Sequence, residues 1–195
     1  PFYLSQNHKL FIMRRFDRDA QLNPLGFEDM TALMGLSAEQ KYTKSYAAIA
    51  KAVRVFCSPE HHRSSLDQLF DSVALSCIVG NGDAHLKNFG VLYGDPLSSD
   101  TRLAPAYDIV NTTAYIPEDS LALDLDGSKS LFASRLGILE FARTCEVENP
   151  ETRIQGLLQT LEVVLKREDE YCRSAPDVAK AIRQSAQGFQ LTFGG

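Results

Sequence analysis

The stretch that most constrains the fold is an apolar helical run that ends in a glycine-rich polar loop. Across residues 64–79, apolar side chains recur every three or four positions and predict a buried helix: Leu66, Leu69, Phe70, Val73, Ala74, Cys77 and Ile78. Gly80 and Gly82 follow, and glycine permits a left-handed backbone and close approach of other groups. We therefore expect the polar residues after this helix to lie at the edge of a cleft, held by a rigid scaffold.

The loop carries the side chains that phosphoryl transfer requires. Asp83, His85, Lys87 and Asn88 lie within six residues, and Asp108 follows twenty residues after Asn88. One carboxylate can orient and deprotonate a hydroxyl, while an amide oxygen and a second carboxylate can hold Mg²⁺ against phosphates. Asp83 and Asn88 are five positions apart, as in the protein-kinase catalytic loop. We therefore expect Asp83 to be the general base or the carboxylate that orients the acceptor hydroxyl, and Asn88 and Asp108 to be Mg²⁺ ligands. The likeness to the kinase loop implies ATP as the phosphoryl donor.

The roles of the neighbouring side chains stay open. His85 is expected to support the loop by hydrogen bonding, with a place near the nucleotide as an open alternative. Lys87 either neutralises phosphate charge or pairs with Asp83. Tyr107 either stacks near the nucleotide or fills the core. The alternative for the whole loop is a polar hairpin after a helix, because an Asp and an Asn with this spacing occur often by chance. The two glycines, a strand predicted over 89–93 and Asp108 favour the functional interpretation.

These motifs also resemble a known family. Residues 81–89 (NGDAHLKNF) with 104–108 (APAYD) resemble the catalytic core of the HipA family, which are bacterial serine/threonine kinases that act as toxins in toxin–antitoxin pairs. Residues 11–18 resemble its hinge strand, 27–42 the segment after the hinge, and 121–129 a later strand-turn element. Together, in this order, these matches are specific, whereas residues 130–195 fit only as a helical tail.

The resemblance implies a fold that is α+β and predominantly helical. It would be a protein-kinase-like C-terminal lobe with a hinge strand and a short catalytic-loop β-hairpin, and with the N-lobe missing. One domain would cover residues 1–195, with a hinge-strand region at 1–18 and a helical large lobe at 19–195. The family implies cofactor-binding roles for Arg14, Arg15, Phe16, Asp17, His85 and Tyr107. By pattern alone, residues 9–16 are a sheet strand that ends in exposed arginines.

A complete kinase also needs a phosphate-covering glycine-rich loop and an anchoring lysine. No such loop precedes residue 11, and the first lysine, Lys9, lies on the predicted hinge strand. Because the HipA family carries both parts upstream, we expect these 195 residues to be inactive or very weak alone, and a longer parent protein to be active. The resemblance further implies a protein substrate such as an aminoacyl-tRNA synthetase, a helix-turn-helix antitoxin of the HipB type, and contact with DNA only through that antitoxin.

Two other functions fit the same residues. A small-molecule kinase of the aminoglycoside-phosphotransferase type uses a similar Asp–x4–Asn pair and a later Asp, although residues 81–89 and 105–108 favour the HipA resemblance. A non-catalytic pseudokinase lobe that holds an antitoxin is the third interpretation. The retained Asp83, Asn88 and Asp108 argue against it.

Composition limits the expected binding partners and cellular compartment of the protein. The net charge of −5 argues against a general binder of phosphate backbones. The four cysteines are widely spaced without a CxxC pair, which indicates reduced thiols in a cytosol rather than structural zinc. No apolar run reaches membrane-spanning length. We therefore expect a cytoplasmic protein without membrane contact.

The rest of the chain is expected to form helices and one further strand. Turn signals at 23–26 precede a helix from Phe27, with Glu28 and Asp29 in its first turn. A second helix is predicted over 43–57 and a half-exposed strand over 120–126. Further helices are predicted over 134–147, 151–172 and 176–189. By position, Thr112, Thr113 and Tyr115 are candidate regulatory sites.

Overall fold

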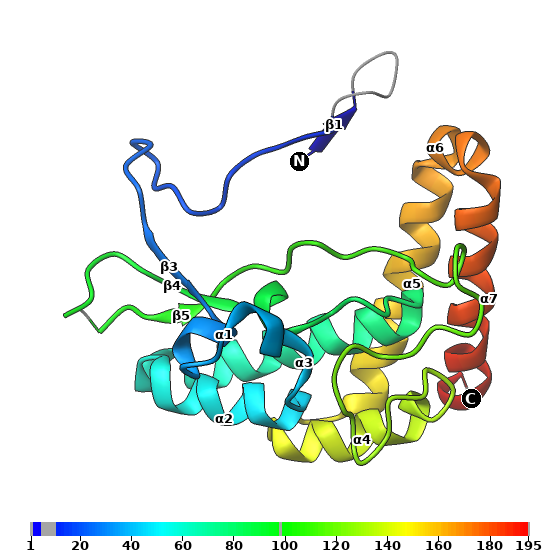
Figure 1. Ribbon diagram of the computed structural model, residues 1–195. Helices are drawn as coiled ribbons and strands as arrows, with labels where there is room; N and C mark the ends of the chain where they lie inside the picture. Colours follow the sequence, from blue (N-terminus) through cyan, green and yellow to red (C-terminus); the bar gives the residue numbers. More distant parts are fainter. Residues whose placement is uncertain (1, 5–10, 98, 195) are drawn as a thin grey trace.

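Helices form most of the chain, and a small antiparallel sheet lies at one end of them (Figure 1). The computed structural model describes residues 2–4, 11–97 and 99–194. The helices are α1 (Met30–Leu33), α2 (Tyr46–Phe56), α3 (His62–Val79), α4 (Ser134–Thr144), α5 (Pro150–Arg167), α6 (Asp169–Ser174) and α7 (Pro176–Phe193). Short 3-10 turns cover Ala38–Tyr42, Pro59–His61 and Leu86–Asn88. The predicted class, α+β and predominantly helical, is confirmed.

Two small sheets complete the fold. β1 (Phe2–Leu4) and β2 (Phe11–Met13) pair antiparallel and are drawn apart from the helical body in Figure 1. β3 (Gly26–Asp29), β4 (Gly90–Tyr93) and β5 (Arg102–Leu103) form a second antiparallel sheet with β4 in the middle. β4 is the strand predicted after the catalytic loop, and β4 with β5 is the expected hairpin.

The strand predicted over residues 9–16 is shorter in the structure. Residues 9 and 10 lie outside the described part of the chain, β2 covers 11–13, and residues 14–16 follow it without strand pairing. The division into a hinge-strand region at 1–18 and a large lobe at 19–195 stays a prediction.

Helix α3 is the centre of the core, as its apolar pattern predicts. Phe70, Val73 and Ile78 have no exposed surface, and α3 packs against α2, α4, α5 and α7. Burial of this apolar surface is the main driving force for folding and holds the helix in the centre of the protein. At that end Gly80 adopts a left-handed conformation with φ +73°, which a glycine accepts without strain.

The helix expected from Phe27 begins later in the structure. Phe27 and Glu28 belong to β3 and pair with Leu92 and Val91 of β4. Asp29 is the N-cap of α1 and accepts hydrogen bonds from the backbone N–H groups of residues 31 and 32, at 2.8 and 3.0 Å. The sequence prediction was wrong here because the strand depends on a partner more than sixty residues away, which no local pattern reveals.

The strand expected over 120–126 is also absent from the described structure, although its alternation is real. Leu121, Leu123 and Leu125 are buried. The described segment makes only isolated bridges, because the start of α2 lies beside it and the Tyr46 N–H donates to the Asp124 carbonyl at 3.0 Å. Alternating burial therefore occurs here without a strand ladder.

The C-terminal helices match their predictions with shifted ends. α4 stops at Thr144, and α7 continues to Phe193. The helix predicted over 151–172 is divided at Glu168 into α5 and α6. In Figure 1, α5 and α7 lie side by side and α6 joins them at one end.

Phe70→Ala should be among the most destabilising core changes. Phe70 is fully buried and stacks on Phe141 with ring centroids 6.5 Å apart. Removing a buried aromatic ring costs about 3–5 kcal/mol of the free energy of unfolding, which urea denaturation can measure. Phe132→Ala is the matched control, because Phe132 is 75% exposed and a change there should stay within about 0.5 kcal/mol. Equal losses in both variants would contradict the assignment of α3 as the core.

Candidate active site

Hydrogen bonds from buried polar groups hold the backbone of the loop after α3. Asn81 is fully buried, and its Oδ1 accepts a hydrogen bond from the Asp83 N–H at 3.0 Å. The Tyr46 hydroxyl, in the core, donates to the Ala84 carbonyl at 3.1 Å. The fixed backbone leaves the Asp83 side chain 47% exposed. The structure therefore presents Asp83 at the surface on a rigid base.

Residues 111 and 112 also hold this loop through hydrogen bonds. The Thr112 N–H donates to the Gly80 carbonyl at 3.0 Å, and the Thr112 hydroxyl oxygen accepts from the Gly82 N–H at 2.9 Å. The Asn111 side chain donates to the Val79 carbonyl at 2.6 Å and so satisfies one of the last carbonyls of α3. The Thr112 hydroxyl is thus part of the loop's support, whereas Tyr115 is 77% exposed. Their regulatory role stays a prediction.

Asp83 has partners that sequence reasoning did not assign. The Tyr42 hydroxyl donates to Asp83 Oδ1 at 2.8 Å. The Lys41 Nζ lies 2.8 Å from the Nε2 of His85, which itself lies 3.9 Å from Asp83 Oδ1. Lys41 and Tyr42 belong to the 3-10 turn at Ala38–Tyr42, about forty residues before the loop. The only sequence signal for them is their place in the segment with family resemblance.

His85 is a neutral imidazole in this arrangement. A lysine ammonium only donates hydrogen bonds, so the Nε2 of His85 must accept from Lys41, and the ring proton is on Nδ1. Burial lowers the pKa of His85, and the nearby Lys41 charge acts in the same direction, although Asp83 opposes both. The contact between His85 and Asp83 is therefore not an ion pair. His85 is placed as a hydrogen-bonding support of the loop, as expected, whereas its proximity to a nucleotide stays a prediction.

The stability of the protein should fall in mild acid because of His85. Since folding lowers the pKa of His85 below the ordinary value of 6.5, the unfolded chain takes up the proton first. The stabilisation is complete above about pH 6.5 and is lost as the pH falls toward the lower folded-state pKa. We expect the urea midpoint to drop more between about pH 7.5 and about pH 5.5 than in His85→Gln, which does not titrate. The other three histidines are common to both proteins, so parallel pH profiles would contradict this account.

Asn88 and Asp108 lie together although twenty residues separate them. The Asn88 Nδ2 donates to Asp108 Oδ2 at 2.7 Å. Because a carboxylate can only accept, this contact fixes which amide atom is nitrogen. Asn88 Oδ1 is buried and has no hydrogen-bond partner among the described residues. An unsatisfied buried acceptor costs about 1–3 kcal/mol, so this oxygen is suited to a cation.

The oxygen set fits Mg²⁺. Mg²⁺ prefers carboxylate and amide oxygens and commonly takes only one or two protein ligands, with phosphates and water completing its shell. Asn88 Oδ1 and the Asp108 carboxylate supply that pair. Within the described residues, no group of three or more His, Cys, Asp or Glu side chains could hold a metal by itself. A metal at Asn88 and Asp108 would therefore depend on oxygens from a ligand.

Tyr107 belongs to an aromatic cluster that reaches the predicted hinge. Its ring centroid lies 5.3 Å from that of Phe16 and 5.9 Å from that of Phe27. The Tyr107 hydroxyl donates to the Lys87 carbonyl at 2.5 Å, and burial raises the pKa of that hydroxyl. Phe16 and Tyr107 are thus brought together beside the catalytic loop. The packing fits the core-filling role, while stacking on a nucleotide stays untested.

The charged candidates of the hinge segment lie outside this cluster. Arg14 and Arg15 are exposed. The Nε of Arg15 donates to Asp17 Oδ1 at 2.7 Å, and the Arg15 guanidinium lowers the pKa of the Asp17 carboxyl. Arg18 also contacts Asp17. These side chains therefore lie at the surface, and an adenine contact through the backbone of residues 14–17 stays a prediction.

Lys87 is exposed next to these groups. In the part of the chain that the structure describes, no ion pair joins it to Asp83, whose Oδ1 is bound by Tyr42 instead. Of the two roles left open for Lys87, pairing with Asp83 has no support in this geometry. A free ammonium beside Asn88 is available to a phosphate.

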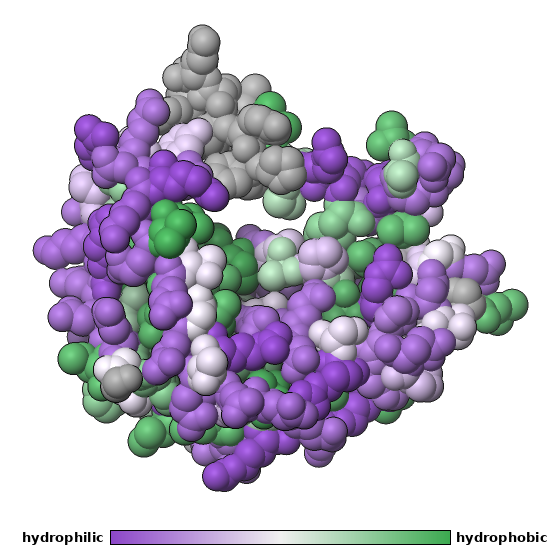
Figure 2. Space-filling model, turned by 180° about the vertical axis from the view of Figure 1, so that it is seen from behind, coloured by the Kyte–Doolittle hydropathy of each residue, from purple (hydrophilic) through white to green (hydrophobic). Residues whose placement is uncertain are grey.

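The molecular surface is hollowed on one face. Figure 2 shows a hollow on the rear face, where hydrophobic residues gather beside polar ones. The segment that follows Asp108 carries exposed hydrophobic side chains, namely Ile109, Val110, Tyr115 and Ile116.

None of the helices described combines the length and the hydropathy that crossing a bilayer requires.

Comparison with known proteins decides the family. The family model for the HipA-like C-terminal domain matches residues 1–185. The chain belongs to the HipA-like C-terminal domain family. It therefore shares the fold expected from residues 81–89 and 104–108, and the match extends through most of the helical tail that resemblance alone left weak.

Individual relatives of the chain are named as kinases. A protein of Haemophilus influenzae named "Putative kinase" is 34% identical over 119 residues, which are 56% of this chain and 34% of that protein. A second protein so described, from Sinorhizobium fredii, is 31% identical over 123 residues, or 62% of this chain and 28% of the relative. The chain thus spans about a third of the length of these curated relatives. The names indicate a kinase-like protein.

The fold has a solved HipA counterpart. The chain superposes on a chain from the complex of Shewanella oneidensis HipA, HipB and operator DNA with a TM-score of 0.73. The match covers 100% of this chain and 51% of that one at 18% sequence identity. At this identity the likeness establishes the fold, a kinase-like C-terminal region of the HipA type.

Proposed function

We propose that this chain is the large lobe of an ATP- and Mg²⁺-dependent serine/threonine-protein kinase that acts as the toxin of a toxin–antitoxin pair. The observation that carries the proposal is the arrangement of Asp83, Asn88 and Asp108. A surface carboxylate is held on a rigid loop, and an unsatisfied amide oxygen lies beside a second carboxylate. The family assignment supports the same activity.

Asp83 is the group that meets the substrate hydroxyl in this mechanism. Tyr42 binds its Oδ1 and leaves Oδ2 as an acceptor on a side chain that is half exposed. As the hydroxyl oxygen bonds to the terminal phosphorus of ATP, its proton would pass to the Asp83 carboxylate, and ADP would leave with the electrons of the phosphorus–oxygen bond that breaks. The neutral His85 places no positive charge of its own next to the Asp83 carboxylate.

Asn88, Asp108 and Lys87 hold the phosphates in this mechanism. Asn88 Oδ1 and the Asp108 carboxylate would bind Mg²⁺, which when bound neutralises phosphate charge. The exposed Lys87 ammonium offers a further positive charge to the transferring phosphoryl group. Positioning of this kind, with electrostatic stabilisation, accounts for most catalysis of phosphoryl transfer.

The proposed toxin kinase would have an antitoxin and a protein substrate as its partners. The HipB-type helix-turn-helix antitoxin is the proposed partner because the solved HipA counterpart was determined with HipB and operator DNA. DNA contact would then pass through the antitoxin, in keeping with the net charge of −5. The proposed substrate is a protein of the translation machinery, with an aminoacyl-tRNA synthetase as the first candidate.

Induced expression in bacteria tests the proposal. We compare the longer protein that carries this chain, its Asp83→Asn variant, and the 195-residue chain alone. Growth arrest by the longer protein alone, with phosphorylated protein in the lysate, is the expected result. Arrest by the Asp83→Asn variant as well would mean that toxicity comes from binding. Phosphorylation of aminoglycosides in place of protein would favour the small-molecule kinase.

A further inference from the structure

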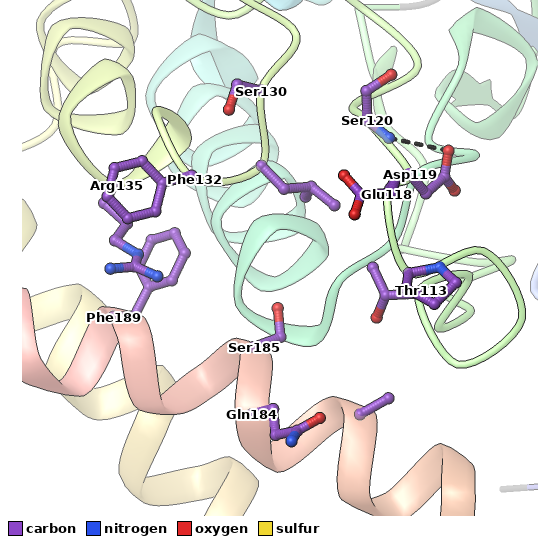
Figure 3. Close-up of a pocket in the computed structure, with 13 residues that line it drawn as sticks. Thr113, Glu118, Asp119, Ser120, Ser130, Phe132, Arg135, Gln184, Ser185 and Phe189 are labelled. Carbon is purple, nitrogen blue, oxygen red and sulfur yellow. Dashed lines mark hydrogen bonds between the residues drawn. The ribbon is translucent and has the colours of Figure 1, made fainter.

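A polar cavity lies beside the catalytic loop and has no part in the proposed chemistry. It encloses about 580 Å³ between residues 113–120, residues 130–135 and α7. Figure 3 shows its lining side chains, which come from these three segments. Its volume falls within the range of about 300–1,000 Å³ that is typical of ligand sites.

The cavity shares its wall with the loop glycines. A Cβ atom at Gly80 would lie 2.8 Å from the Thr113 Oγ1 and 3.2 Å from the Ser185 Oγ, and both of these residues line the cavity. A Cβ atom at Gly82 would lie 2.1 Å from Oδ2 of Asp119, another lining residue. Gly82 directly precedes Asp83. The side chains that line the cavity therefore pack directly on the backbone of the two residues that flank Asn81, and the second of these precedes Asp83.

Charges of opposite sign face the cavity from different walls. Glu118 and Asp119 line it from the segment after Thr113, and Arg135 lines it from the start of α4 (Figure 3). The Arg135 guanidinium lies 4.7 Å from the centroid of the Phe132 ring. Within the described residues, neither Glu118 nor Arg135 has an ion-pair partner closer than 4.0 Å, so both charges are available to a ligand.

Neutral hydrogen-bonding groups lie between these charges. Ser130 precedes α4, while Gln184 and Ser185 come from α7 (Figure 3). Hydroxyl and amide side chains can pair with the N–H and C=O groups of an extended peptide, which need partners when they leave water. Charged and neutral polar groups in this arrangement suit an extended peptide that carries one basic and one acidic side chain.

We propose that this cavity binds the segment of the protein substrate that flanks the phosphoacceptor serine or threonine. A basic side chain of that segment faces Glu118 and Asp119, and an acidic one faces Arg135. This inference rests on the proposed kinase function, because that function makes a protein hydroxyl the acceptor at Asp83. It adds that the substrate is selected by a charge pattern next to the acceptor.

Peptide binding tests the proposal without requiring phosphotransfer. Fluorescein-labelled peptides with a central serine and flanks of Arg then Glu, Glu then Arg, or neutral residues are titrated by anisotropy against the longer protein. We expect one of the two charged orders to bind more tightly than the other and than the neutral peptide. Charge reversal by Glu118→Lys or Arg135→Glu should weaken that peptide about three- to tenfold. The double variant should invert the preferred order, which a change in folding alone would not do.

Matched charge reversals and a conservative variant complete the design. Glu162→Lys and Arg183→Glu make the same changes in the separate groove between α5 and α7 and should leave the preference intact. Arg135→Lys keeps the charge and should retain the preference, which guards against loss of fold in Arg135→Glu. Equal binding of all peptides, or no binding, would overturn the proposal, as would free arginine or glutamate competing as strongly as a peptide. Selective binding without any phosphotransfer would leave the cavity assignment standing and remove the kinase function instead.

Discussion

Asp83→Asn should lower phosphotransfer to protein hydroxyls by about 10²- to 10⁴-fold, the usual contribution of a general base. The amide keeps an acceptor oxygen for the Tyr42 hydroxyl, so the loop geometry should survive. What is lost is the carboxylate that takes the hydroxyl proton. Initial rates of ³²P transfer from ATP to lysate protein, catalysed by the proposed full-length kinase, measure the effect, and nucleotide binding should be unchanged.

Asp126→Asn is the matched control for this change. Asp126 is exposed and adopts φ +53°, a conformation that asparagine accepts readily. The same chemical change there should leave both rate and stability unaltered. A loss of rate confined to Asp83→Asn supports its role as the base, whereas undiminished transfer by that variant would remove Asp83 from the mechanism.

Asp108→Asn should lower the rate by about 100-fold or more and raise the Mg²⁺ concentration needed for half-maximal activity. A metal ion contributes several kcal/mol to stabilising a phosphoryl transition state, and each 1.4 kcal/mol corresponds to about tenfold in rate. The fold should persist, because Asp108 has φ +55° and asparagine tolerates it. The amide oxygen at position 108 can still accept from the Asn88 Nδ2.

Mg²⁺ titrations distinguish whether Asp108 is a metal ligand or only a structural residue. In the Asp108→Asn protein, excess Mg²⁺ should restore part of the activity, because the Asn88 oxygen and the phosphates still bind the ion. Asp126→Asn again serves as the control. An unchanged Mg²⁺ requirement with a lowered rate would contradict the assignment of Asp108 as a metal ligand.

Local patterns in the sequence determined the centre of this protein. The apolar spacing of 64–79 defined α3, because a helix with a wide apolar face must bury that face. The glycines after it marked the loop, and the strand predicted over 89–93 corresponds to β4. The motif and the later Asp predicted Asp83, Asn88 and Asp108 as site residues. Their roles stay predictions, and the structure places Asn88 beside Asp108.

The tertiary structure alone decided which distant residues complete the site. Tyr42 and Lys41 reach Asp83 and His85 across about forty residues, and Phe16 meets Tyr107 across about ninety. β3 exists because β4 lies next to it, so residues 27–28 could not be recognised as a strand locally.

The cavity beside Gly80 and Gly82 is the clearest case of a feature without a local signal. Its walls come from residues 113–120, residues 130–135 and α7, and none of these segments has a pattern that points to the others. Periodicity reports which face of an element is buried, because burial follows the repeat of the backbone. It does not report which elements meet, since that depends on how the whole chain packs around α3.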